Sequence, residues 1–212
     1  YRKAASGYAD YLERYPHDKQ LYQLTFYLAD TLYYSLDFNR AAVEYAKVRA
    51  MRPDGEFLID ATANLVFAYE QILKAAISNG EIEELAIKTS SEREEGVEIV
   101  PIEIPLLHKQ YVDSIDILAE TNLQEENLPG LLYTTAQTYQ GFDHLDEAIR
   151  RFHHVLETYP QSAETASFSV ESLVDLYQTK RDYRAVAEFT KKIMDDPNFA
   201  EYYRDMGYGV AL

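Results

Sequence analysis

The chain has 212 residues, of which 47% are hydrophobic, so it is long enough to bury a substantial core. Its 36 acidic and 20 basic residues give a formal net charge of −16, which disfavours nucleic acid and anionic membrane surfaces as partners and favours basic proteins. Cysteine is absent, which excludes a disulfide framework and a thiolate metal site, and no apolar run approaches the length of a transmembrane helix.

Apolar residues recur at steps of three and four along most of the chain, a pattern typical of amphipathic helices. In the first stripe Tyr1, Ala4, Tyr8 and Tyr11 share one face, and Pro16 ends the helix because the residue before proline avoids the helical conformation. The stripes predict helices over residues 1–14, 18–35, 39–51, 56–78, 105–121, 126–141, 144–159, 162–180, 182–195 and 198–211.

The gap between the fourth and fifth predicted helices is unusual. Asn79-Gly80 provides a left-handed helix end, and residues 81–103 then contain eight acids against Lys88 and Arg93. We expect residues 79–104 to be an inserted acidic loop, partly disordered, with its tail extended against the helices. It is either a docking element that offers acids to a basic surface or a tolerated surface insertion.

Small or apolar residues also recur twelve positions apart, at the same level of two consecutive predicted helices. Small side chains there let the two backbones approach closely, so each pair predicts an antiparallel helical hairpin. The pairs are Ala29 and Ala41, Ala136 and Ala148, and Val174 and Val186. Since the first and last predicted helices lack partners, we expect residues 1–212 to be a single segment of a longer repeat protein, truncated at both ends.

Residues 131–160 resemble a tetratricopeptide repeat most closely. Ala136 and Ala148 match the two small positions of that family, Phe152 and Val155 match the packing positions of the second helix, and Pro160 matches the terminator. The resemblance implies an all-α fold, a right-handed superhelical solenoid of antiparallel helix pairs with about ten helices. The Tyr-Pro endings are similar to repeats of bacterial envelope proteins, which implies a periplasmic or envelope-associated location, with the cytoplasm as the alternative.

In the tetratricopeptide family the first helix of each pair lines a concave groove, which implies a binding site for a peptide or partner subunit. Lys and Arg are missing from the matching positions, so the expected ligand has basic and apolar side chains. Alternatively, some of the aromatic residues only fill gaps between hairpins. The matching positions are Gln23, Phe26, Asp30, Tyr33, Tyr34, Phe57, Asp60, Asn64, Phe67, Tyr133, Gln137, Gln140, Phe168, Glu171, Asp175 and Gln178.

Catalytic and metal-binding patterns are weak. The adjacent His153 and His154 point about a quarter-turn apart on a helix, whereas metal pairs on a helix use steps of three or four. We therefore predict no enzyme activity, no cofactor and no metal site. The expected function is a protein–protein interaction scaffold in a bacterial envelope complex for assembly, motility or secretion, without direct membrane insertion. The alternative is a structural spacer or self-assembly arm of a larger repeat protein.

Overall fold

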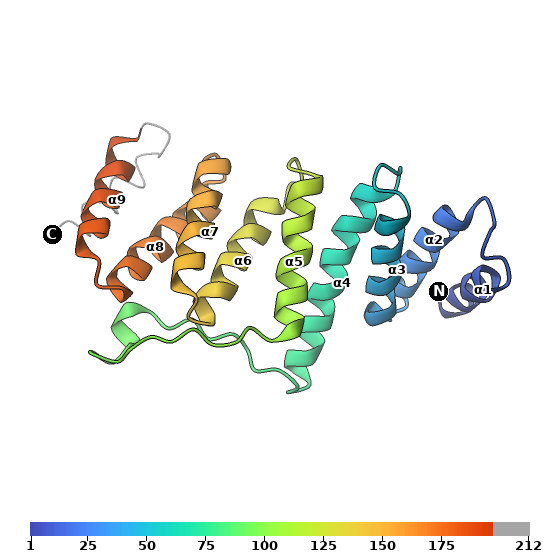
Figure 1. Cartoon of the computed structure of the whole chain (residues 1–212), viewed down its shortest axis with the longest axis horizontal. Coiled ribbons are helices and arrows are strands. Elements are labelled where there is room, and N and C mark those ends of the chain that lie inside the picture. The colour runs from blue at the N-terminus through green and yellow to red at the C-terminus, as the bar shows by residue number, and fades with distance from the viewer. Residues whose placement is uncertain (197–212) are drawn as a thin grey trace. The chain divides into compact units, whose positions relative to one another are not determined.

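The computed structural model describes residues 1–196, so the helix predicted over 198–211 lies outside the described residues. Within residues 1–196 the fold is all-α, and consecutive helices pack together (Figure 1). The helices are α1 (Arg2–Arg14), α2 (Leu21–Tyr34), α3 (Phe38–Met51), α4 (Leu58–Ser78), α5 (Leu106–Thr121), α6 (Leu128–Gly141), α7 (Leu145–Thr158), α8 (Ala163–Thr179) and α9 (Tyr183–Asp195), with a short 3-10 helix η1 (Ser90–Glu92).

The chain divides into two units. Unit 1 comprises Tyr1–Glu84 and Pro105–Leu128, and unit 2 comprises Leu85–Ile104 and Pro129–Leu212. In unit 1 the predicted seam residues Ala29 and Ala41 are fully buried between α2 and α3. Tyr45 and Leu32 fill the space around this seam, and α4 closes the core with Ala61.

In unit 2 the residues twelve positions apart are also buried. Ala136 and Ala148 have no exposed surface, and Phe152 packs beside them. The bulkier pair Val174 and Val186 is also buried. The small residues twelve positions apart therefore lie at helix–helix seams in both units, as predicted, because the hydrophobic effect favours burying the stripe on which they lie.

The first helix of each hairpin ends in the same turn, which we call the hairpin turn. The N–H of a residue with positive φ donates to the carbonyl three residues earlier, and the next N–H donates to the carbonyl five residues earlier, at 2.8–3.0 Å. This pattern is a Schellman motif. The residues with positive φ are Leu36, Gly80, Asp143 and Arg181, with φ between 56° and 71°.

A second kind of turn follows α1, α3, α5 and α7. Its first residue has φ between −147° and −127°, donates its N–H to the carbonyl four residues earlier, and accepts a hydrogen bond from the N–H three residues later. The four residues are Tyr15, Arg52, Asn122 and Tyr159. The two kinds of turn alternate along the chain, so α2–α3, α4–α5, α6–α7 and α8–α9 are copies of one hairpin design.

The second hairpin alone among the described four carries a long insertion in its hairpin turn. Gly80 and Glu81 complete the Schellman motif at the end of α4, as the predicted left-handed glycine requires. Residues 82–105 then separate this motif from α5, whereas the other hairpin turns lead directly into the second helix. The structure describes the whole insertion and shows no regular structure in it except η1.

Candidate functional site

The predicted groove residues of unit 1 lie together on α2 and α4. The rings of Phe26 and Phe57 stack with centroids 4.5 Å apart and planes 8° apart. About one turn further along α2 and two turns further along α4, the Asn64 amide donates to the Asp30 carboxylate at 3.3 Å. Side chains from the first helices of two successive hairpins are thus in contact.

Asp30 also accepts a hydrogen bond from a third helix, α3. The Tyr45 hydroxyl on α3 donates to its carboxylate at 2.7 Å. Burial raises the pKa of Asp30 above its ordinary value, and it outweighs the hydrogen bonds from Tyr45 and Asn64, which favour the charged form. Asp30 is therefore a half-buried structural acid, less available to a partner than a surface carboxylate.

The other unit 1 positions differ in accessibility. Phe26 is only 7% exposed and belongs to the core, as the gap-filling alternative expects. Tyr34 is 60% exposed, Asp60 is exposed, and Tyr33 and Phe67 are half-buried. The accessible chemistry of this surface is therefore aromatic and acidic.

In unit 2 the predicted positions on α6 and α8 also meet. Tyr133 lies 6.1 Å from Phe168 between ring centroids, and its hydroxyl is 3.5 Å from the Ser172 hydroxyl. The Gln137 amide donates to the same Tyr133 hydroxyl at 3.2 Å. Phe168 is 44% exposed and Glu171 is exposed, so this surface repeats the aromatic and acidic character found in unit 1.

Two predicted positions at the end of α8 contact the inserted segment. The backbone N–H of Ser90 in η1 donates to Asp175 at 2.8 Å, and the Ser90 hydroxyl donates to the Gln178 side chain at 3.3 Å. Asp175 therefore holds η1 in place, and η1 closes this end of the α6–α8 surface.

Further contacts hold residues 85–104 along the hairpin turns of unit 2 (Figure 1). Arg93 forms an ion pair with Asp143 at 2.6 Å, and only 14% and 19% of the two side chains are exposed. The Ile102 N–H donates to the Phe142 carbonyl at 2.9 Å, and the His144 Nε2–H donates to the Ile102 carbonyl at 2.8 Å.

Gly141 accommodates the start of this segment. A side chain at position 141 would overlap with Leu85, which packs directly over the glycine. Between the segment and the α8–α9 turn lies an open cavity of about 1010 Å³, lined among others by Arg93, Arg181 and Tyr183. The segment is thus seated on unit 2 by apolar, ionic and main-chain contacts.

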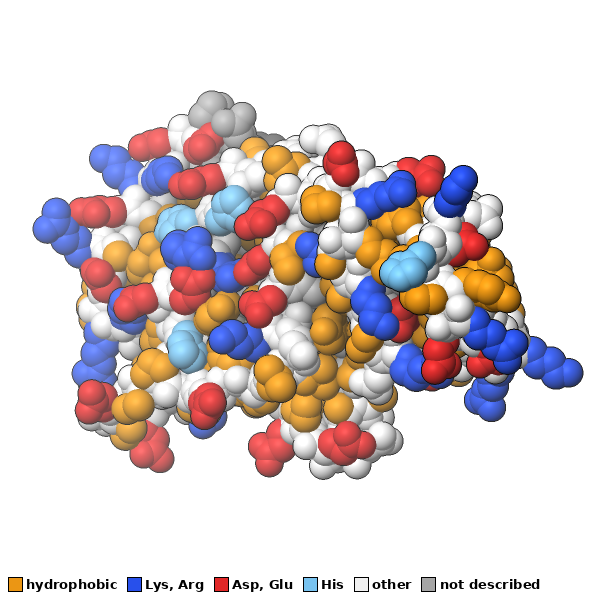
Figure 2. All heavy atoms as spheres, turned by 45° about the vertical axis from the view of Figure 1, so that its right-hand side comes forward, with side chains coloured by type: hydrophobic (Ala, Val, Ile, Leu, Met, Phe, Trp, Pro, Cys, Tyr) orange, Lys and Arg blue, Asp and Glu red, His pale blue; other side chains and the backbone are white. Residues whose placement is uncertain are grey.

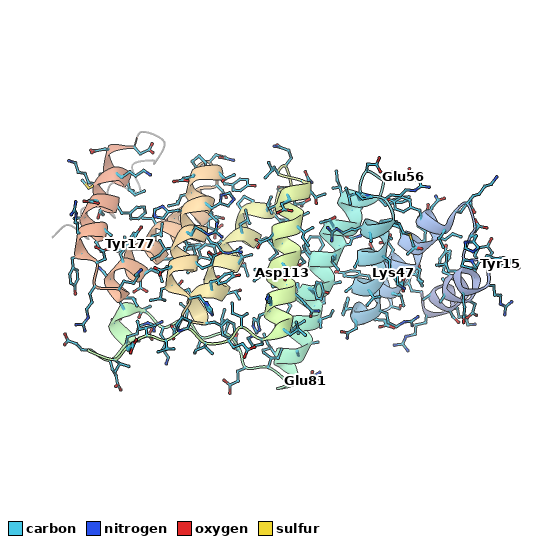
Figure 3. The ribbon with its side chains drawn as sticks, in the orientation of Figure 1. Tyr15, Lys47, Glu56, Glu81, Asp113 and Tyr177 are labelled. Atoms are coloured by element: carbon cyan, nitrogen blue, oxygen red, sulfur yellow. The ribbon has the colours of Figure 1, made fainter. Side chains whose placement is uncertain are left out.

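The adjacent His153 and His154 lie on α7. His153 Nε2 lies 2.7 Å from the hydroxyl of Tyr177 (labelled in Figure 3), and burial lowers the pKa of His153. Within residues 1–196 no group of three or more His, Asp or Glu side chains is arranged to hold a metal ion. None of the described helices has the length and apolar character needed to cross a membrane.

Neither similarity to known proteins nor the distribution of surface charge identifies a ligand for these residues. No family model and no curated protein matches the sequence. On the face shown in Figure 2, acidic and basic side chains are interspersed with apolar ones. The candidate sites are therefore taken from the geometry: the first-helix surfaces, formed by α2 and α4 in unit 1 and by α6 and α8 in unit 2, and the inserted segment at residues 85–104.

The contacts of Ser90, Arg93 and Leu85 were not foreseen from the sequence. Each joins residues far apart in the chain, with separations of 85 positions for Ser90–Asp175 and 50 for Arg93–Asp143. One signal was present: Arg93 and Lys88 are the two bases among eight acids.

A first prediction concerns the ionisation of Asp30. The pKa of Asp30 is higher in the folded protein than its ordinary value of 3.8, so the folded state binds the proton more tightly than the unfolded state. This contribution to the free energy of unfolding is complete below pH 3.8 and is lost as the pH rises through the folded-state pKa. Asn cannot ionise, so Asp30→Asn should gain stability relative to the wild type as pH rises from about 3 to about 7 in urea unfolding. Asn39→Ala on α3, an exposed position where neither residue ionises, is the control, with a constant difference expected. A constant difference for Asp30→Asn as well would contradict the burial argument.

A second prediction concerns the seating of the inserted segment. Arg93→Ala leaves the largely buried Asp143 carboxylate without its ion pair, so the free energy of unfolding should fall by about 2 kcal/mol. Tryptic cleavage after Lys88 should become faster. The control is Arg184→Ala, which breaks a solvent-exposed ion pair with Glu188 and should leave the unfolding midpoint unchanged. Equal effects of the two substitutions would show that the segment is not seated through Arg93.

Proposed function

We propose that this chain is a protein-interaction module of the tetratricopeptide type, a right-handed superhelical solenoid that binds a partner segment on its first helices. The observation that carries the proposal is the direct contact between predicted groove positions, Phe26 with Phe57 and Asp30 with Asn64. The alternating turns support it, because a repeated hairpin is the unit from which such solenoids are built.

The ligand in this proposal is a peptide or subunit surface with basic and apolar side chains. Asp60 and Glu171 are the exposed acids of the two surfaces, and Tyr34 and Phe168 are their exposed aromatic residues. Aromatic side chains provide large contact area, and opposite charge gives selectivity and a faster approach. The similarity of the Tyr-Pro endings to envelope repeats supports a role of the module in a bacterial cell-envelope complex.

The charge of the first helices provides the test. Asp60→Lys combined with Glu171→Lys reverses one exposed acid in each unit, without touching Asp30 or Asp175, which have structural hydrogen bonds. On an array of random 12-residue peptides, the wild type should select peptides rich in Arg or Lys and apolar residues. The double variant should bind these at least tenfold more weakly, because it places like charges opposite the ligand.

The matched control is Asp113→Lys with Glu157→Lys, which makes the same change in net charge on the second helices α5 and α7 (Asp113 is labelled in Figure 3). It should retain the selected peptides. If both double variants lose binding equally, net charge rather than the first-helix surface governs recognition, and the proposal fails.

A further inference from the structure

Residues 97–103 of the inserted segment, here called the outer edge, run in an extended path between η1 and α5 (Figure 1). The outer edge is fixed to unit 2 at one residue, since both the N–H and the carbonyl of Ile102 are hydrogen-bonded to the α6–α7 turn. The preceding residues are fixed by Ser90 and Arg93. The outer edge is therefore held in place before any partner arrives.

The outer edge exposes an unusual amount of apolar surface. Val97, Val100 and Ile102 are 61%, 63% and 54% exposed, although they lie within six consecutive positions. β-Branched side chains of this kind favour packing on a strand surface. More than half of the surface of each of the three residues is left uncovered by the described residues.

Part of its backbone is also unpaired. In an extended chain the N–H groups of successive residues point to opposite sides, so Ile99 and Glu103 direct theirs away from the side that Ile102 uses. Among residues 1–196, neither of these N–H groups donates a hydrogen bond. Pro101, which lies between them on the same side, has no N–H, so an added strand can pair with the N–H groups of Ile99 and Glu103 alone.

The charge of the outer edge indicates which kind of partner segment it would bind. Glu98 and Glu103 are exposed on the outer edge. Of the bases that line the same cavity, Arg93 is paired with Asp143 and Arg181 with Glu95, which leaves Lys88 as the one without an ion pair among the described residues. A second copy of this chain would oppose glutamate with glutamate, which is unfavourable. A segment that carries Lys or Arg between apolar residues complements both the charge and the apolar side chains.

We propose that the outer edge is a second interaction site, separate from the first helices, which binds an extended basic and apolar segment of another protein as a β-strand. Pairing of main chains supplies the affinity, and Val97, Val100 and Ile102 with the two glutamates supply the selectivity. Because the segment is already seated on unit 2, binding does not have to order it first.

The test uses a fluorescein-labelled decapeptide of alternating Lys and Val as the probe, with fluorescence anisotropy as the readout. The matched probe is the same peptide N-methylated at alternate residues, which keeps every charge and side chain but cannot pair along one edge. The wild type should bind the N-methylated probe at least tenfold more weakly. Equal affinity for the two probes would overturn strand pairing.

The site is located with protein variants of unchanged helix content by circular dichroism. Val97→Ser, Val100→Ser and Ile102→Ser together should weaken binding of the unmodified probe at least tenfold. The control triple, Val43→Ser, Met51→Ser and Ile59→Ser, removes exposed apolar residues from unit 1 and should change affinity less than twofold.

Hydrogen exchange separates this site from the first-helix surface. With the probe bound, the amides of Ile99 and Glu103 should exchange more slowly. Protection confined to α2 and α4, or binding abolished by Asp60→Lys with Glu171→Lys but intact in the outer-edge triple variant, would overturn the proposal while leaving the first-helix function standing.

Discussion

Close packing at the seam of each helix pair sets the rest of the structure. Ala29 meets Ala41 in unit 1 and Ala136 meets Ala148 in unit 2, and all four side chains are fully buried. Protein interiors are packed as densely as organic crystals, so two helices in contact through alanine methyl groups leave no room for larger side chains at these positions. The seam brings the paired helices close, and the Schellman motif then joins them in a short turn.

The insertion shows how a repeat can be modified without losing its packing. The Schellman motif of α4 is complete at Gly80, so the extra residues leave the hairpin only after its first helix is properly ended. Loop-closure entropy grows slowly with length, which makes such an addition tolerable. Here the added residues also form an ion pair and main-chain hydrogen bonds with the helices of unit 2. These contacts fix the position of the inserted segment on the helices.

Periodicity and chain-breaking residues were sufficient to predict the α-helices within residues 1–196. The stripe predicted over 144–159 is α7 at Leu145–Thr158, because Phe152 and Val155 must face the core and Pro160 cannot continue the helix. Accessibility at the candidate site could not be predicted in this way. Asp30 and Asp175 occupy the same position in the pattern, yet Asp30 accepts a hydrogen bond from Tyr45 on the next helix, whereas Asp175 accepts one from the Ser90 N–H in η1. The position of η1 depends likewise on Asp175, at a separation that no local pattern encodes.

The most direct measurement is the unfolding free energy of Ala136→Leu, which forces a larger side chain into the α6–α7 seam. If paired helices in close contact are the unit of this fold, stability in urea should fall by about 1–3 kcal/mol. Ala187→Leu, at an exposed position of α9, should leave stability nearly unchanged. Equal stability of the two variants would contradict the seam and the stacked hairpins that depend on it.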